Sequence, residues 1–475
     1  MRLHTVLLAA GIALAGCATP RDADVRLPGA YEAAAEAPAG AIPLDTWWTA
    51  YSDAQLTELV QQALERNTDV RTARSRLDEV KAQRTGAILQ YLPQGDLNAA
   101  GRRADTKQIG GTVANIPGFS TSGVSEQYSA NFNVSWEVDP WGRGFVAYRA
   151  ADAEVDRVRF AYEAARAQIA AQTADAYFQA KGLAIQLADA RETARIQQGL
   201  YDLASKRAVA GLAATAEPDR IAGDLAQARA NVEALDAQLQ IQKRAILILA
   251  GRVFEPTANV AATPDVGEAP GVPASLPSDL LQRRPDVRQA QAAVRSAAAQ
   301  QKLAGLAFFP SFSLTPGLGW SRIEQPGFSS ETTSWTIGGS VMQPLLSIPR
   351  LMSDLKVQNA RTEQAVTAYE KTVQTAFQEA ESSLVGLDAD RRRVALLRDG
   401  EVRARRAFEA ARIGYERGLT DLNTTLSSEQ AWRAVRAQLT SAEVQALRRS
   451  VQAVKAIGGG WPAQKYAQAR PEAAR

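Results

Sequence analysis

The residue types that most often carry enzyme chemistry are nearly absent from this chain. Its 475 residues include a single histidine, His4, and a single cysteine, Cys17, both near the N-terminus. The rest of the sequence therefore has no imidazole base, no thiolate nucleophile and no zinc site of His and Cys ligands. A hydrolase that uses carboxylates remains an alternative, but no paired acids form a recognisable motif. We expect a protein that is not an enzyme and that holds no metal or cofactor, apart from a covalent group on Cys17.

Cys17 ends a stretch that is typical of a signal peptide. Arg2 supplies a positive charge, residues 5–14 are apolar, and small residues precede the cysteine. The apolar run is shorter than the roughly 20 residues that cross a bilayer as a helix. Leu-Ala-Gly-Cys resembles the bacterial lipobox, whose cysteine becomes the first mature residue and carries acyl chains such as palmitate. We expect a signal peptide over 1–16 and a lipidated linker over 17–45, and Ala18 is compatible with sorting to the outer membrane.

Acidic and basic residues nearly balance along the chain. It carries 54 Lys and Arg against 51 Asp and Glu, and the two signs are interspersed rather than clustered. This pattern gives no electrostatic case for a nucleic-acid partner. A hydrophobic content of 46% is typical of a protein with a substantial core.

The body of the chain contains two copies of one large unit. Residues 65–93 align without a gap on residues 282–310, and each half continues with alternating segments, a long stretch without proline and a Gly-Leu pair. A Pro-rich segment separates the halves. The predicted organisation is a first repeat over 46–255, a connection over 256–277, a second repeat over 278–460 and a tail over 461–475.

Each half is predicted to contain two β-strands. They cover about 95–104 and 127–139 in the first half and about 311–321 and 334–346 in the second. In two of them, apolar and polar residues alternate with a period of two. The residues on the apolar face include Phe132, Val134, Trp136, Phe312, Leu314 and Trp320.

A soluble hairpin would show the same alternation. Strands of roughly ten residues with Trp or Tyr near their ends instead favour membrane strands, which cross the bilayer at a tilt. Loops rich in Gly, Ser and Thr are predicted over 105–127 and 321–333. Four strands cannot close a barrel in a membrane, so several protomers must share one.

Long helices follow the strands in both halves. No proline lies between Pro140 and Pro218 or between Pro349 and Pro462, and Ala, Gln, Glu, Arg and Leu dominate both stretches. An unbroken helix over 146–210 would be ~100 Å long. A generic coiled coil or helical bundle is the alternative, but the high alanine content favours helices that pack closely on several sides, as in a tube. The Gly-Leu pairs lie where each long helix should reverse.

Several motifs together resemble the TolC-like outer-membrane efflux proteins, in particular the NodT-type lipoprotein branch that works with tripartite RND-type exporters. These motifs are Trp47-Trp48, Asp139 to Arg143 (DPWGR), Leu281 to Val287 (LQRRPDV), Gln343-Pro344-Leu345 and Gly458 to Trp461 (GGGW). The resemblance implies a mainly α-helical fold with a membrane β-barrel. Four strands from each protomer of a homotrimer would form a 12-stranded barrel, which a long α-helical barrel continues into the periplasm.

The resemblance also implies a function and a location. Such a trimer lies in the bacterial outer membrane, lipid-anchored and spanning. It passes drugs, metals or other small solutes from an inner-membrane transporter and a periplasmic adaptor protein to the exterior. We expect the pump, rather than the lining of the duct, to select the solute. Two alternatives remain, which are a type I protein secretion conduit and a periplasmic coiled-coil lipoprotein scaffold without a channel.

The same resemblance assigns adaptor contact and the periplasmic gate to the reversals between helices. The matching residues are Gly211, Leu212, Tyr415, Arg417, Gly418, Leu419 and Asp421. Family members often carry an aspartate ring just after the second reversal, whereas this chain has Thr424 and Ser427, so either Asp421 replaces the ring or none exists. Two glycines that usually follow Pro-Leu are replaced within Ser347-Ile348-Pro349.

Overall fold

The computed structural model describes residues 23–32, 44–107, 109–110, 122–211, 214–272 and 277–460. The predicted signal peptide, Cys17, Leu212 and the tail after Gly460 lie outside these residues. The chain forms two compact units, each built from separate stretches of sequence. We call them the strand unit, which contains Asp78–Arg157 and Gln291–Ala368, and the helix unit, which contains Asp24–Leu77, Val158–Ala290 and the chain from Tyr369 onward.

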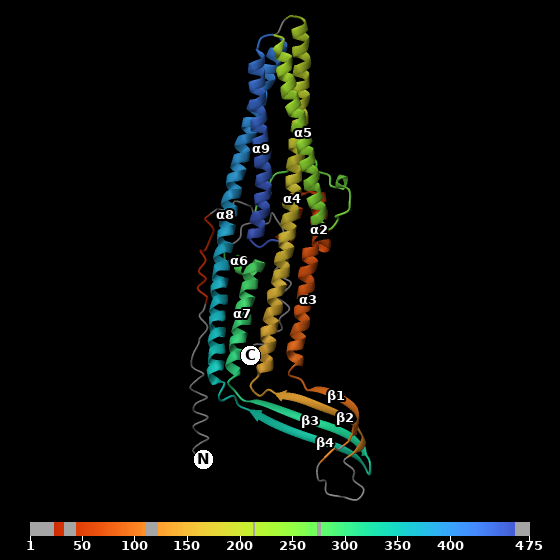
Figure 1. The fold of residues 1–475 in the computed structure, drawn as a ribbon. Coiled ribbons are helices and arrows are strands. Elements are labelled where there is room, and N and C mark those ends of the chain that lie inside the picture. The colour runs from red at the N-terminus through yellow and green to blue at the C-terminus, as the bar shows by residue number, and fades with distance from the viewer. Residues whose placement is uncertain are drawn as a thin grey trace. The chain divides into compact units, whose positions relative to one another are not determined.

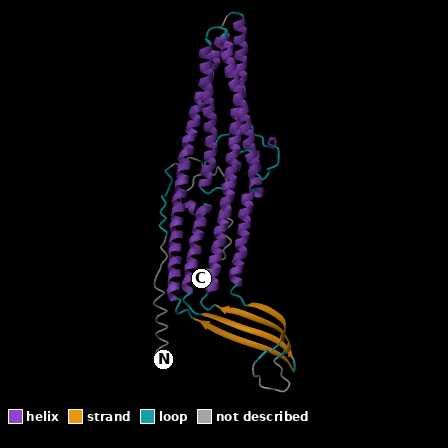
Figure 2. Ribbon diagram, viewed as in Figure 1, coloured by secondary structure: helices purple, strands orange, loops and turns teal. Residues whose placement is uncertain are grey.

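The strand unit contains a four-stranded antiparallel sheet with the order β1-β2-β3-β4, drawn in orange in Figure 2. Its strands are β1 (Gln94–Thr106), β2 (Gly123–Val138), β3 (Ser311–Gln325) and β4 (Phe328–Met342). The strands of the first repeat therefore pair directly with those of the second, through β2 and β3. The predicted pair of strands in each half is confirmed.

The limits of the strands differ from the predicted ones. The prediction of a loop over 321–333 is wrong. β3 and β4 remain paired as far as Gln325 and Phe328, so only Pro326 and Gly327 lie in the turn between them. The Ser and Thr residues of this segment belong to a strand with many polar side chains, and composition alone does not separate such a strand from a loop. β4 ends at Met342 rather than 346, just before Pro344, which cannot donate a backbone hydrogen bond.

Helices make up the rest of the structure (Figure 1). Their bounds are η1 (Leu44–Tyr51), α2 (Ala54–Arg66), α3 (Thr68–Leu89), α4 (Arg143–Val209), α5 (Ala216–Leu249), η2 (Thr257–Asn259), η3 (Pro277–Asp279), α6 (Leu280–Arg283), α7 (Pro285–Leu306), α8 (Ile348–Glu416) and α9 (Leu422–Ala456). The residues of α3, α4, α7 and α8 are divided between the two units. Among the described helices, none contains an apolar stretch long enough to cross a membrane.

The segment Ser347-Ile348-Pro349, which replaces the two glycines noted above, leads directly into α8. Pro349 is the second residue of α8. Proline is tolerated there because backbone N–H groups of the first helical turn have no partner within the helix. α8 then continues to Glu416 as one of the two longest helices.

In the helix unit, α4, α5, α8 and α9 run alongside one another (Figure 1). A continuous apolar core joins them and includes Trp47, Tyr177, Leu247 and Leu447. Ion pairs cross between neighbouring helices at intervals. They join Arg448 to Asp175, Arg436 to Asp189, Arg449 to Asp390 and Arg398 to Glu443. Such partly exposed pairs add little stability each, so burial of the apolar faces supplies most of the packing energy.

The internal repeat is also visible in hydrogen bonds. α3 and α7 contain 22 residues each. Just before α3, Asn67 Nδ2 donates to the Leu249 carbonyl at 3.0 Å, and just before α7, Arg284 Nη1 donates to the Ala456 carbonyl at 3.1 Å. Leu249 is the last residue of α5, and Ala456 is the last residue of α9. In each repeat, a hydrogen bond thus joins the end of the helical hairpin (α4–α5 or α8–α9) to the start of α3 or α7.

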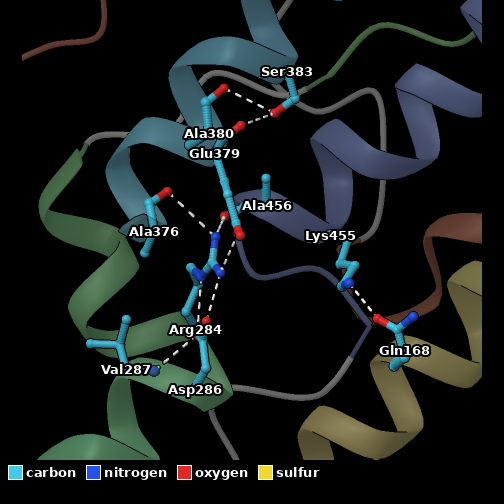
Figure 3. A network of polar contacts seen from close by, with 10 residues as sticks. All are labelled: Gln168, Arg284, Asp286, Val287, Ala376, Glu379, Ala380, Ser383, Lys455 and Ala456. Carbon is cyan, nitrogen blue, oxygen red and sulfur yellow. Dashed lines mark hydrogen bonds and ion pairs between the residues drawn. The ribbon is translucent and has the colours of Figure 1, made fainter. Parts of the chain in front are cut away.

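Arg284 is the centre of the larger of these two networks (Figure 3). Arg284 is only 7% exposed to solvent. Nη2 donates to Asp286 Oδ2 at 2.6 Å and to Glu379 Oε2 at 2.7 Å, and Nη1 also reaches the Ala376 carbonyl at 3.4 Å. One guanidinium therefore connects α7, α8 and α9, which uses the planar, multivalent geometry that lysine lacks.

A glycine with a left-handed backbone conformation follows the last helix of each repeat. Gly251 and Gly458 have φ of 71° and 85°, and a Cβ at either would lie 2.7–2.8 Å from the Cβ of Arg66 or Arg283 and within 3.2 Å of their backbone atoms. Gly418 has a similar φ of 76° but no neighbour within 4 Å. We expect Gly251→Ala and Gly458→Ala to cost about 2–4 kcal/mol each, against about 1–2 kcal/mol for Gly418→Ala.

Denaturant unfolding of the purified variants tests this difference. A larger loss for the two junction glycines than for Gly418 is the expected result, because all three share the backbone strain and only two add a clash. Equal losses at the three positions would contradict the crowding of Arg66 and Arg283 against the hairpin ends.

Candidate functional site

The reversal between α8 and α9 is a compact turn with exposed residues at its apex. The Leu419 N–H donates to the Gly414 carbonyl at 2.8 Å, and the Gly418 N–H donates to the Tyr415 carbonyl at 3.1 Å. This pairing satisfies the last carbonyls of α8 and requires the left-handed φ of 76° at Gly418. Leu419 is 79% exposed, and Arg417, Gly418 and Asp421 are exposed as well.

Asp421 closes the turn by capping α9. Its Oδ1 accepts from the Thr424 N–H at 2.9 Å, and its Oδ2 accepts from Thr424 Oγ1 at 2.7 Å. These hydrogen bonds from Thr424 hold the pKa of Asp421 below its usual value. Because both carboxylate oxygens accept hydrogen bonds at the N-terminus of α9, Asp421 stabilises the start of this helix.

The first reversal, between α4 and α5, follows the same plan at its start. The Gly211 N–H donates to the Ala208 carbonyl at 3.0 Å, and Gly211 has a φ of 71°. Gly211 is exposed, whereas its neighbour Leu212 lies outside the described residues. The two glycines that the sequence pairs across the repeats thus adopt the same backbone conformation.

Tyr415 differs from the other predicted site residues because it is buried. It is 2% exposed and packs in a cluster with Leu200, Ala204, Ile221, Leu422 and Leu426. The cluster draws on α4, α5, α8 and α9, so it joins the hairpin of one repeat to that of the other. Burial raises the pKa of the Tyr415 hydroxyl. Tyr415 therefore positions the second turn and presents almost no surface of its own.

Two arginines that the sequence did not single out complete the region. Arg207 of α4 places its guanidinium 4.9 Å from the centre of the Tyr415 ring and donates to the Tyr415 carbonyl at 3.3 Å. Arg220 of α5 donates to Asn423 Oδ1 at 2.6 Å. Both contacts join residues about 200 positions apart, and no local motif marks such pairs. We call this region, with its two turns and these contacts, the hairpin tip.

The strands carry the second group of predicted site residues. Leu97, Phe132, Leu318 and Trp335 are direct partners across β1 to β4 and form one row. They are 42–75% exposed, which is unusual for a continuous row of large apolar side chains. Val134, Trp136, Phe312, Leu314 and Trp320 lie on the same face by the two-residue period of a strand.

The side chains on the opposite face of the sheet are mostly small and polar. Asn98, Asn131, Gly319 and Ser334 form the neighbouring row. A Cβ at Gly319 would lie 2.8 Å from Ser334 Oγ and 2.9 Å from Asn131 Oδ1, so the glycine leaves room for these side chains. One face of the sheet thus suits an apolar medium and the other suits water.

Aromatic side chains with hydrogen-bonded polar ends border the apolar row on both sides. Toward one end, Trp320 Nε1 donates to Glu331 at 2.8 Å and the Tyr128 hydroxyl donates to Glu126 at 3.0 Å. Toward the other end, Trp136 Nε1 donates to the Tyr91 carbonyl at 3.2 Å. Amphipathic aromatic residues take such positions at the two interfaces of a membrane.

In the part of the chain that the structure describes, no three His, Cys, Asp or Glu residues gather into a group that could hold a metal ion. Acidic residues instead pair with arginine or cap helices, as Asp421 does. The predicted lipidation site, Cys17, lies outside the described residues.

The chain is similar to known outer-membrane proteins over most of its length. The model of the outer membrane efflux protein family matches residues 59–252 and 276–459, which together exceed half of the chain and correspond to the two repeats. The pyoverdine export outer membrane protein OpmQ of Pseudomonas aeruginosa is 26% identical over 98% of both chains. The outer membrane protein OprJ of the same species is 29% identical over 90% of this chain and 89% of its own.

A solved structure shows the same fold. The open state of the MtrE outer membrane channel of Neisseria gonorrhoeae superposes with a TM-score of 0.80 at 24% identity, over 94% of this chain and 98% of that one. The predicted fold class, mainly helical with four strands per chain and two repeats, is confirmed.

Proposed function

Because the chain belongs to the outer membrane efflux protein family, we propose that three copies of it form the exit duct of a tripartite export system. The protein is an outer-membrane efflux channel that extends into the periplasm. Each protomer would add its four strands to a shared 12-stranded barrel, since four strands alone leave two unpaired edges in the membrane. The two-faced sheet carries this proposal, with its apolar row toward lipid and its polar row toward the water-filled lumen.

Oligomeric state and solubility test this part of the proposal. A Cys17→Ala variant, directed to the periplasm by an unrelated signal peptide, is expected to require detergent for extraction and to run as a trimer. Detergent dependence without a lipid anchor would come from the exposed apolar row. A monomer that is soluble without detergent would contradict the shared barrel.

We further propose that Cys17 carries acyl chains and anchors the mature N-terminus. The resemblance of its surroundings to a lipobox supports this assignment. Mass spectrometry of the purified N-terminal peptide is expected to show a lipid-modified cysteine as the first residue, and a Cys17→Ser variant is expected to retain its unprocessed leader. An unmodified cysteine within an intact N-terminus would contradict the assignment.

The hairpin tip is proposed as the contact for a periplasmic adaptor protein that links the duct to an inner-membrane transporter. The exposed side chains of Leu419 and Arg417 support this role. A photo-crosslinking residue at Leu419 is expected to capture the adaptor in intact cells. Leu396 of α8 is the matched control, since it is equally apolar and 77% exposed against 79% for Leu419. Capture at both positions, or at Leu396 alone, would contradict the assignment.

The solute that passes through the duct is proposed to be a small molecule or ion. Family membership and the names of the relatives support this class. The polar row of the sheet presents amide and hydroxyl groups, which tolerate many solutes, so the choice among them would fall to the pump.

A further inference from the structure

A carboxyl group is buried next to the hairpin tip without the partners that its charge would need. Glu429 lies on α9, about two helical turns after Asp421. The residue is 0% exposed. Gln197 of α4, itself 2% exposed, donates from Nε2 to Glu429 Oε2 at 2.6 Å. This is a buried contact between the hairpin of the first repeat and that of the second.

In both side chains, Glu429 and Gln197, one oxygen atom is left without a hydrogen bond. Glu429 Oε1 and Gln197 Oε1 both lack a hydrogen-bond partner among the described residues. If Glu429 is ionised, neither of these two oxygens carries a proton, and both buried acceptors are left unpaired, which is unfavourable. If Glu429 is protonated at Oε1, its hydroxyl becomes a donor for Gln197 Oε1. One proton then satisfies both oxygens and closes a cyclic acid–amide pair with two hydrogen bonds.

We propose that Glu429 and Gln197 form a proton-binding site that holds the two hairpins together at the tip. This inference rests on the proposed function, because the contact it controls borders the predicted periplasmic gate. The protonated acid–amide pair favours a closed tip. Loss of the proton leaves a charge and an unpaired amide oxygen between α4 and α9 and favours their separation.

The charges around Glu429 do not replace the proton. Arg433 on α9 approaches Oε1 only to 3.7 Å, which is too long for a hydrogen bond. Arg433 Nε is itself buried and has no hydrogen-bond partner among the described residues, so Arg433 acts on Glu429 through its charge alone. Its side chain also lines a cavity of about 520 Å³ together with Asp189 and Asp224. Asp224 on α5 acts in the opposite direction and disfavours a second negative charge.

The balance of these effects brings the protonation of Glu429 into the neutral pH range. Burial, opposed by Arg433 and assisted by Asp224, raises the pKa of Glu429 to about 7 from the model-peptide value of 4.5. A raised carboxyl pKa stabilises the closed contact fully below pH 4.5, and that stabilisation is lost as the pH rises through 7. If the open tip exposes Glu429 to water, each unit of pKa difference changes the ratio of the two states about tenfold, so the full change over the difference between about 7 and 4.5 is roughly three hundredfold.

Single-channel recording of the purified full-length protein between pH 5 and pH 8.5 tests the site. The wild type is expected to open more often as the pH rises, with a midpoint near the pKa of Glu429. Glu429→Gln keeps the shape of the side chain and supplies a permanent amide donor to Gln197. This variant is expected to stay in the low-pH state at every pH. Asp202→Asn, which changes an exposed acid on α4, is the matched control and should keep the wild-type response.

Infrared difference spectroscopy gives a second readout that does not depend on conduction. The carbonyl stretch of a protonated carboxylic acid is expected at pH 6, lost at pH 8.5, and absent from Glu429→Gln at both. An unchanged pH response of Glu429→Gln in the recordings, or the lack of this band in the wild type, would overturn the inference. A protein that shows the band but never conducts would leave the proton site in place and contradict the proposed duct instead.

Discussion

Phe132→Arg is expected to prevent stable insertion of the sheet into the outer membrane. Phe132 belongs to the apolar row and lies midway along β2 between Tyr128 and Trp136, where an arginine on the lipid face costs about 2–4 kcal/mol. Three copies in the proposed trimer would raise the total to about 6–12 kcal/mol, which is comparable to the whole stability of a domain. The measurement is the fraction of the protein recovered as detergent-extracted trimer from the outer-membrane fraction.

Asn131→Arg is the matched control for this prediction. It introduces the same side chain one residue earlier on the same strand, but on the opposite face of the sheet. There it would meet the water-filled lumen, so we expect trimer recovery close to that of the wild type. If the two variants inserted equally well, or failed equally, the assignment of one face to lipid and the other to water would be wrong.

Arg284→Met is expected to cost about 3–5 kcal/mol, the largest loss for any single change in the helix unit that we describe. The substitution fills a similar volume but removes the guanidinium donors to Asp286, Glu379 and the carbonyls of Ala376 and Ala456. The three helices that this guanidinium connects would lose their common partner. Denaturant unfolding or the heat resistance of the purified trimer measures the effect.

Two further variants separate charge from geometry. Arg284→Lys keeps the charge but has no planar fork, so we expect a loss intermediate between the wild type and Arg284→Met. Arg283→Met changes the adjacent residue, which pairs with Asp45 at a longer 3.6 Å and is 29% exposed at its side chain. Its expected cost is below about 1 kcal/mol. A similar loss for Arg283→Met and Arg284→Met would contradict the role of the buried network.

The repeat was the part of the fold that the sequence revealed most clearly. The gap-free alignment of 65–93 on 282–310 corresponds to α3 and α7, which have equal lengths and are each followed by the first strand of their half. LQRRPDV marked its region as important, but only the structure shows that Arg284 reaches α8 and α9. The segments it joins lie up to 172 residues apart, beyond any local pattern.

The strands and the tip show where local patterns stop being informative. Ser329 to Thr333 reads as a loop by composition, yet these residues belong to β4 and pair with β3. Within this segment Ser330 and Thr332 lie on the polar face of the sheet, together with Ser334. Tyr415 reads as a surface residue of the turn, yet it is buried against the other hairpin. The contact between Gln197 and Glu429 spans 232 residues, and neither residue stands out in its own helix.

The most direct test of the central claim is the conductance of the unlipidated protein in planar bilayers. Without acyl chains on Cys17, membrane insertion would rest on the apolar face of the strands. Detergent-purified trimers of Cys17→Ala are expected to insert and to produce discrete conductance steps, which would establish the sheet as part of a membrane channel. A water-soluble protein that never conducts would contradict the duct and leave an anchored helical scaffold as the better description.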